Sequence, residues 1–224
     1  MDFCFDAFSS REPVSTSLEL AKVPLIWAAL AAAICVPIAA AATSEQLAWR
    51  GPVYILAGFA GMIALGLVLV QPLLIGGYLP GVPAYRGRRV HHWIGGALVL
   101  AVVVHVGGLW ITSPPDMIDA LLFTSPTPFS PFGVIAMWAI LTVALLAALR
   151  RRLGLRLRTW RIVHIPLALV IVAGSVVHCL LIEGTMETVS KAVLCALVLG
   201  AAVKVMADLW VRRKREPVRA ESSS

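Results

Sequence analysis

The chain has 224 residues, of which 59% are hydrophobic and 14% are charged, and its formal net charge is +7. Soluble domains carry about 25% charged residues, so this composition, with a mean hydropathy of +0.88, argues against a water-soluble globular protein and indicates an integral membrane protein. Several spans of ~20 residues fill a chain of this length, which leaves no room for a separate catalytic domain. The arginines cluster at the ends of apolar runs, as the positive-inside rule describes, so the positive charge does not indicate nucleic-acid binding.

Apolar runs predict six membrane-spanning helices. Residues 1–21 lack the basic start of a signal peptide, so we predict a cytoplasmic N-terminal segment before a retained first span. The tail, residues 212–224, is basic and then polar, which predicts a disordered cytoplasmic segment. The predicted fold is an all-α integral membrane six-helix bundle over residues 22–211. Its predicted spans are residues 23–42, 53–75, 90–112, 132–149, 162–181 and 189–211.

The charges of the loops predict an orientation. The links at 76–89 and 150–161 and the C-terminal tail are basic, whereas the links at 113–131 and 182–188 contain acidic residues and no basic ones. The positive-inside rule then places both termini in the cytoplasm, in a multi-pass protein of a bacterial-type inner membrane. Within the third-to-fourth link, residues 116–123 (DMIDALLF) predict a short helix lying on the membrane surface.

Two histidine pairs lie inside these spans. His91 and His105 are fourteen residues apart in the third span, and His164 and His178 are fourteen apart in the fifth. Over that interval a helix returns to within about 40° of its starting face and rises ~21 Å. Each helix therefore presents one histidine near each side of the membrane, on a single face. With the orientation above, His91 and His164 share the cytoplasmic side, and His105 and His178 share the outer side.

Haem bound between the two helices explains this pattern. Polar residues in the hydrocarbon are costly and indicate function by default, and imidazole is a haem axial ligand. Gly95 and Ala168, each four residues after an inner histidine, lie on the same face, where small side chains let a flat porphyrin approach, although small residues are common at any membrane helix interface. The sequence thus predicts two haems. The predicted iron ligands are His91 and His164 at the inner site and His105 and His178 at the outer site.

Residues next to the inner histidines are candidates for binding haem propionates. His92 lies roughly 140° from His105 on an ideal helix, so His91 fits the ligand face better and His92 is expected to be an interfacial neighbour. Arg pairs with carboxylates in bidentate fashion, although the same arginines also serve as topology determinants. The candidate propionate contacts are Arg88, Arg89, Arg161 and His92.

Two further features lie near the ends of the spans. Trp93 and Trp160 are expected to be interfacial anchors, with packing on haem as a lesser alternative. In the sixth span, Lys204 and Asp208 are one helical turn apart, and pairing between them would lower the cost of a lysine in the membrane.

The pieces HHWIGGALVLAVVVH and WRIVHIPLALVIVAGSVVH resemble the third and fifth helices of the ferric reductase-like transmembrane domain, over about residues 52–211. That family includes ferric reductases, NADPH oxidases and the stand-alone bacterial haem b membrane subunit of the periplasmic methionine sulfoxide reductase system. The resemblance implies b-type haem between helices three and five of a six-helix bundle. In the family's layout the ligand lies two residues before the aromatic residue of helix three, which falls on His91, and His105, His164 and His178 match the other ligand positions.

One departure from the family limits the expected function. Ferric reductases and NADPH oxidases carry a C-terminal flavin and nicotinamide domain, whereas this chain ends soon after Arg215 with no Gly-rich dinucleotide fingerprint. The resemblance therefore implies an oxidoreductase component that passes electrons from a separate donor, a flavin reductase or quinol, to an outer-side acceptor. Two alternatives stay open: a quinol-oxidising membrane cytochrome b, and a histidine-relay proton or metal transporter without haem.

Overall fold

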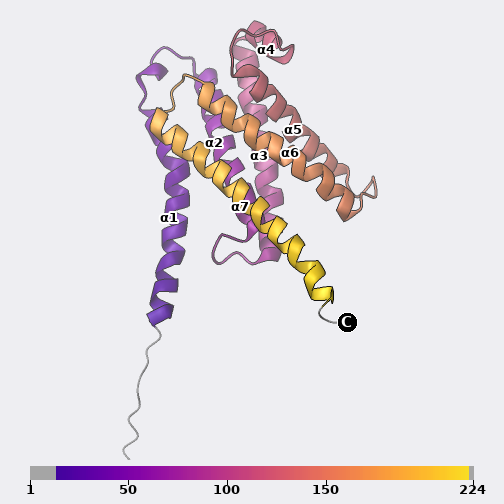
Figure 1. The fold of residues 1–224 in the computed structure, drawn as a ribbon. Coiled ribbons are helices and arrows are strands. Elements are labelled where there is room, and N and C mark those ends of the chain that lie inside the picture. Colours follow the sequence, from indigo (N-terminus) through magenta and orange to yellow (C-terminus); the bar gives the residue numbers. More distant parts are fainter. Residues whose placement is uncertain (1–13, 222–224) are drawn as a thin grey trace, which may run out of the picture.

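The computed structural model describes residues 14–221 and the side chains of residues 22–211. The expectations for residues 1–13 and 222–224 lie outside the described residues. Within the described part of the chain, six helices are long and apolar enough to cross a membrane, which confirms the predicted number of spans. In chain order the elements are α1 (Val14–Ala42), the 3-10 turn η1 (Glu45–Leu47), α2 (Pro52–Gly76), α3 (Ala84–Thr112), α4 (Pro114–Leu121), α5 (Ser130–Leu149), α6 (Leu157–Leu181) and α7 (Thr188–Glu221) (Figure 1).

Four helices extend by five or more residues beyond the predicted spans, and the first of them is α1, which begins at Val14. α3 begins at Ala84, directly after Pro83, and α6 begins at Leu157, so the arginines that precede the inner histidines lie on the helices. α7 continues past residue 211 to Glu221, through the basic stretch for which the sequence predicted disorder. Hydropathy marks only the apolar part of a helix, whereas the main-chain hydrogen bonds of the helix continue through residues of good helix propensity such as arginine.

The bundle is built from two antiparallel helix pairs. α2 packs against α3, α5 packs against α6, and α7 lies against α6, α2 and α1 (Figure 1). Close packing within each pair depends on a glycine. A Cβ on Gly108 would lie 2.8 Å from Ala57, and a Cβ on Gly174 would lie 3.1 Å from Ala136. Small residues at these crossings let the two backbones of a pair approach each other.

α3 and α6 approach each other much less closely than the members of either pair. The space between these two helices, walled by parts of α2, α5 and α7, is where the histidines meet. The short α4 follows α3 and confirms the helix expected in the third-to-fourth link. The start of α1 and the end of α7 lie at the same end of the bundle, as an even number of crossings requires (Figure 1).

Candidate functional site

The structure brings the four histidines together as two facing pairs. The ring centroids of His91 and His164 are 6.2 Å apart with an angle of 82° between the ring planes. Those of His105 and His178 are 6.5 Å apart at 80°. In each pair one ring comes from α3 and the other from α6, so the histidines are matched in depth along the bundle.

Main-chain carbonyl groups orient His105 and His178, which are called the outer pair after their predicted side of the membrane. Nδ1 of His105 lies 2.8 Å from the oxygen of Ala57 on α2, and Nδ1 of His178 lies 2.9 Å from the oxygen of Phe129, just before α5. A carbonyl oxygen only accepts hydrogen bonds, so Nδ1 carries the proton in each neutral ring and Nε2 keeps its lone pair. This is the tautomer in which a histidine binds a metal through Nε2 while a second partner fixes its orientation.

Two glycines allow these close contacts. A Cβ on Gly61, one turn beyond the carbonyl that His105 contacts, would lie 2.9 Å from Nδ1 of that ring. A Cβ on Gly133 would lie 2.5 Å from Nδ1 of His178. The same carbonyl-and-glycine arrangement therefore occurs in both helix pairs.

A cavity of about 390 Å³ adjoins the inner pair. This volume falls within the range of about 300–1,000 Å³ that is common for ligand pockets. Apolar side chains form most of the lining, and Gly95 and Ala168, the small residues expected to face a ligand, belong to it. Trp160 also lines the cavity and stacks on His164, with ring centroids 5.0 Å apart and planes inclined by 17°. Trp160 therefore supports the inner site in addition to any role as an anchor.

Three buried polar atoms at this cavity have no hydrogen-bond partner in the structure. They are Nδ1 of His91, Nδ1 of His164 and Oε1 of Gln71. Buried polar groups in native proteins nearly always have a partner, so a set of unsatisfied groups on an apolar cavity indicates a place for a ligand. The inner site differs in this respect from the outer site, where both Nδ1 atoms are bonded.

The candidate propionate contacts lie around the inner pair. His92 lines the cavity, and its ring centroid is 6.1 Å from that of His91. Arg88, Arg89 and Arg161 are exposed and do not belong to the cavity lining. Contact of any of these four side chains with propionate stays a prediction.

A comparison with known families agrees with this geometry. A family model described as "Ferric reductase like transmembrane component" matches residues 57–175, just over half of the chain. The chain belongs to the ferric reductase-like transmembrane family. The match is shorter than the 52–211 expected from the resemblance, and His178 lies just beyond its end. No curated protein and no solved structure matched the chain.

Ferric reductase-like transmembrane domains generally bind haem, and the residues present fit that group. The inner site combines an apolar cavity, two imidazoles from facing helices and unpaired buried nitrogens. The outer site offers two imidazoles whose hydrogen bonds leave Nε2 available. A metal–imidazole bond measures about 2 Å, so one iron bonded to both rings of a pair is compatible with the centroid spacings of 6.2 and 6.5 Å.

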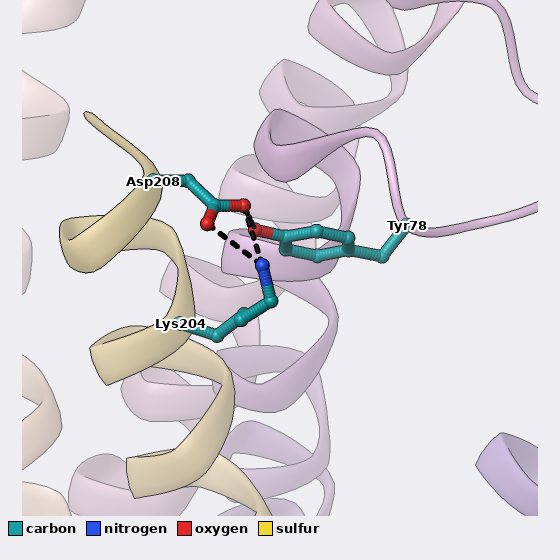
Figure 2. Close-up of polar contacts among 3 residues, drawn as sticks. All are labelled: Tyr78, Lys204 and Asp208. Atoms are coloured by element: carbon teal, nitrogen blue, oxygen red, sulfur yellow. Dashed lines mark hydrogen bonds and ion pairs between the residues drawn. The ribbon is translucent and has the colours of Figure 1, made fainter. Parts of the chain in front are cut away.

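A polar cluster attaches α7 to the loop after α2 (Figure 2). Lys204 Nζ lies 2.7 Å from both carboxylate oxygens of Asp208, which confirms the expected pair. The Tyr78 hydroxyl donates to the same carboxylate, and Lys204 Nζ lies 5.1 Å from the centroid of the Tyr78 ring. Desolvation, followed by the bond to Asp208, raises the pKa of the Tyr78 phenol, which keeps it a donor. The cluster fixes the part of α7 from which Val205 and Leu209 line the cavity.

Several of these residues were not predicted from the sequence. Gln71 could have been singled out in the sequence, because its amide is a polar group within the aliphatic run LVLVQPLLIG, in the hydrocarbon. Gly61 and Gly133 could not have been singled out, since glycine is frequent in membrane helices. Tyr78 joins its cluster across 130 residues of sequence, which no local pattern reveals.

Proposed function

We propose that this protein carries electrons across a bilayer through two b-type haems. His91 and His164 hold the inner haem, and His105 and His178 hold the outer haem. Family membership supports transmembrane electron transfer. The single observation that carries the assignment is the pair of facing imidazoles at each of two depths, with centroid distances of 6.2 and 6.5 Å. Bound haem supplies a one-electron carrier whose potential depends on its ligands, hydrogen bonds and burial.

The chain's own residues act by holding and orienting the ligands. Fourteen residues of helix at about 1.5 Å per residue set the two histidines of each helix ~21 Å apart along its axis. The carbonyl groups of Ala57 and Phe129 keep the outer imidazoles in the metal-binding tautomer. Apolar side chains from the surrounding helices line the inner cavity and exclude water from it.

Electrons pass from the cytoplasmic side, or from the membrane, to an acceptor on the outer side. The basic links at 76–89 and 150–161 support this orientation, because they flank the inner histidines on the side that the positive-inside rule assigns to the cytoplasm. The donor is a separate flavin reductase or quinol, and the acceptor is a separate outer-side partner. Arg88, Arg89, Arg161 and His92 are proposed to meet the propionates of the inner haem.

A haem spectrum tests this function directly. The protein is expressed with adequate haem supply, purified into lipid nanodiscs, and examined by reduced-minus-oxidised absorbance with pyridine haemochrome quantitation. We expect the spectrum of bis-histidine b-type haem at two haems per chain. Protein without haem would rule the function out, and one haem per chain would rule out the two-site arrangement.

The donor is tested with the same preparation. Haem reduction is followed after the addition of a quinol or of a reduced flavin with its reductase. Reduction by quinol alone would identify a quinol-oxidising cytochrome b, whereas reduction only through flavin would identify a flavin-fed subunit. Proton or metal-ion flux into liposomes by haem-free protein would instead support the histidine relay.

A further inference from the structure

Gln71 on α2 has an unexplained buried amide. Its Oε1 is buried without a hydrogen-bond partner, and the side chain lines the same cavity as His91 and His164. A Cβ built on Gly95 would lie 3.4 Å from Gln71 Nε2. The amide group therefore lies beside α3, one turn from His91. An amide oxygen kept out of water in this way needs a donor.

The register between α2 and α3 indicates which donor. The helices are antiparallel, and His105 on α3 donates to the carbonyl of Ala57 on α2. Fourteen residues before His105 is His91, and fourteen residues after Ala57 is Gln71. Gln71 therefore stands opposite His91 as Ala57 stands opposite His105.

The outer level (Ala57 and His105) and the inner level (Gln71 and His91) differ in the residue of α2 that lies one turn after Ala57 or Gln71. At the outer level that residue is Gly61, which leaves the ring of His105 free to reach a main-chain carbonyl. At the inner level it is Ile75, whose side chain lines the cavity. The main-chain carbonyl of Gln71 interacts with His91, yet this contact does not meet hydrogen-bond geometry, and Nδ1 of that ring stays without a partner. Nδ1 of His91 therefore needs a side-chain acceptor, because the main-chain oxygen does not complete this hydrogen bond.

We propose that Gln71 is the positioning residue of the inner haem, because its Oε1 accepts a hydrogen bond from Nδ1 of His91 when Nε2 of that ring binds the iron. This inference rests on the proposed function. It joins two of the three unpartnered atoms at the cavity, one able to donate and the other able only to accept. The third, Nδ1 of His164, is on a ring held by stacking on Trp160.

The hydrogen bond has a consequence for the haem potential. An acceptor on Nδ1 makes the imidazole a more basic ligand, and a more basic ligand stabilises the ferric state. Gln71 therefore lowers the midpoint potential of the inner haem and leaves the outer one unchanged. Removing the acceptor should raise the inner potential.

The test compares Gln71→Met, which keeps the length and removes the acceptor, with Gln71→Glu, which keeps an acceptor. Ile63→Val on the same helix serves as a control, because Ile63 is exposed and does not line the cavity. Midpoint potentials are measured by spectroelectrochemical titration in nanodiscs, and a His105→Leu background identifies the inner component. We expect an upward shift in Gln71→Met, none in Ile63→Val, and retention of the inner haem in Gln71→Glu. In the infrared difference spectrum of the wild type, reduction should shift an amide C=O band that Gln71→Met lacks.

An inner potential in Gln71→Met equal to that of the wild type would overturn the role of Gln71. Loss of the inner haem from Gln71→Glu as well as from Gln71→Met would also overturn it, because Glu supplies an acceptor of the same length. Failure of the proposed function has a different signature, since the wild-type protein would then contain no haem.

Discussion

Nδ1 of His105 lies 2.8 Å from the main-chain oxygen of Ala57, and the hydrogen bond between them fixes the imidazole tautomer at the outer site. The ring reaches that oxygen because Gly61, one turn later, has no side chain. His178 and Gly133 repeat the arrangement on the other helix pair. The orientation of the imidazoles of His105 and His178 thus depends on two glycines.

Gly61→Ala should weaken haem binding at the outer site. The new methyl group would lie 2.9 Å from the His105 ring and push it from its carbonyl, and loss of such supporting contacts costs about 10–100-fold in metal affinity. The measurement is outer-haem content during dilution with a haem-binding competitor. Gly58→Ala on the same helix meets nothing within 4 Å and should leave haem content unchanged. Equal retention by the two variants would contradict this mechanism.

Substitution of His91 and His92, one at a time, should show which of the two histidines binds the inner haem. His91→Leu removes the ring that faces His164 at 6.2 Å, so haem content should fall from two to one per chain. His92→Leu should keep two haems, because His92 has no facing imidazole on α6 among the described ring contacts. Haem per chain is quantified by pyridine haemochrome. The reverse result would assign the inner ligand to His92.

Removal of the Tyr78 hydroxyl should loosen the attachment of α7. Tyr78→Phe deletes the bond to Asp208, and hydrogen bonds to charged groups contribute about 1.5–3 kcal/mol. Thermal unfolding in detergent should show a lower midpoint than in Tyr85→Phe, whose ring is 62% exposed. Indistinguishable midpoints for the two variants would show that the cluster adds no stability.

The same bond has a definite pH dependence. Burial and Asp208 raise the pKa of Tyr78 above its unfolded value of 10.0. The stabilisation is therefore fully present below pH 10 and is lost as the pH rises through the raised pKa. The difference in unfolding midpoint between wild type and Tyr78→Phe should shrink in strongly alkaline buffer. A constant difference would contradict the shift.

Glu187 should make the start of α7 sensitive to acid. Its carboxylate oxygens accept bonds from the main-chain N–H groups of Val189 at 2.7 Å and Ser190 at 2.6 Å. These bonds lower the pKa of Glu187 below its ordinary 4.5, so they are intact above pH 4.5 and are lost as the pH falls through the lowered value. Hydrogen exchange at both amides should lose protection in acid relative to Glu187→Gln, which does not titrate. Parallel pH profiles for the wild type and Glu187→Gln would contradict this role of the Glu187 carboxylate.

Much of this site follows from local sequence. The spacing of the four histidines and the length of the apolar runs are properties of single helices, so the six spans and the two facing pairs were predictable before any contact was known. The preference for His91 over His92 came from helical phase, and the layout of the resembling family agreed with it. The resemblance of the two histidine-bearing helices also led to the family that the comparison confirmed.

The contacts that orient the histidine rings could be identified only from the tertiary structure. Hydrogen bonds such as His105 to Ala57 join residues 48 positions apart, and their existence depends on the register in which one helix crosses another. That register is set by glycines packed against facing backbones, and glycine is too common in membrane helices to be singled out in a sequence. The sequence alone therefore determined which imidazoles face each other, and the crossing of α2 and α3 decided that Ala57 and Gln71 stand behind them.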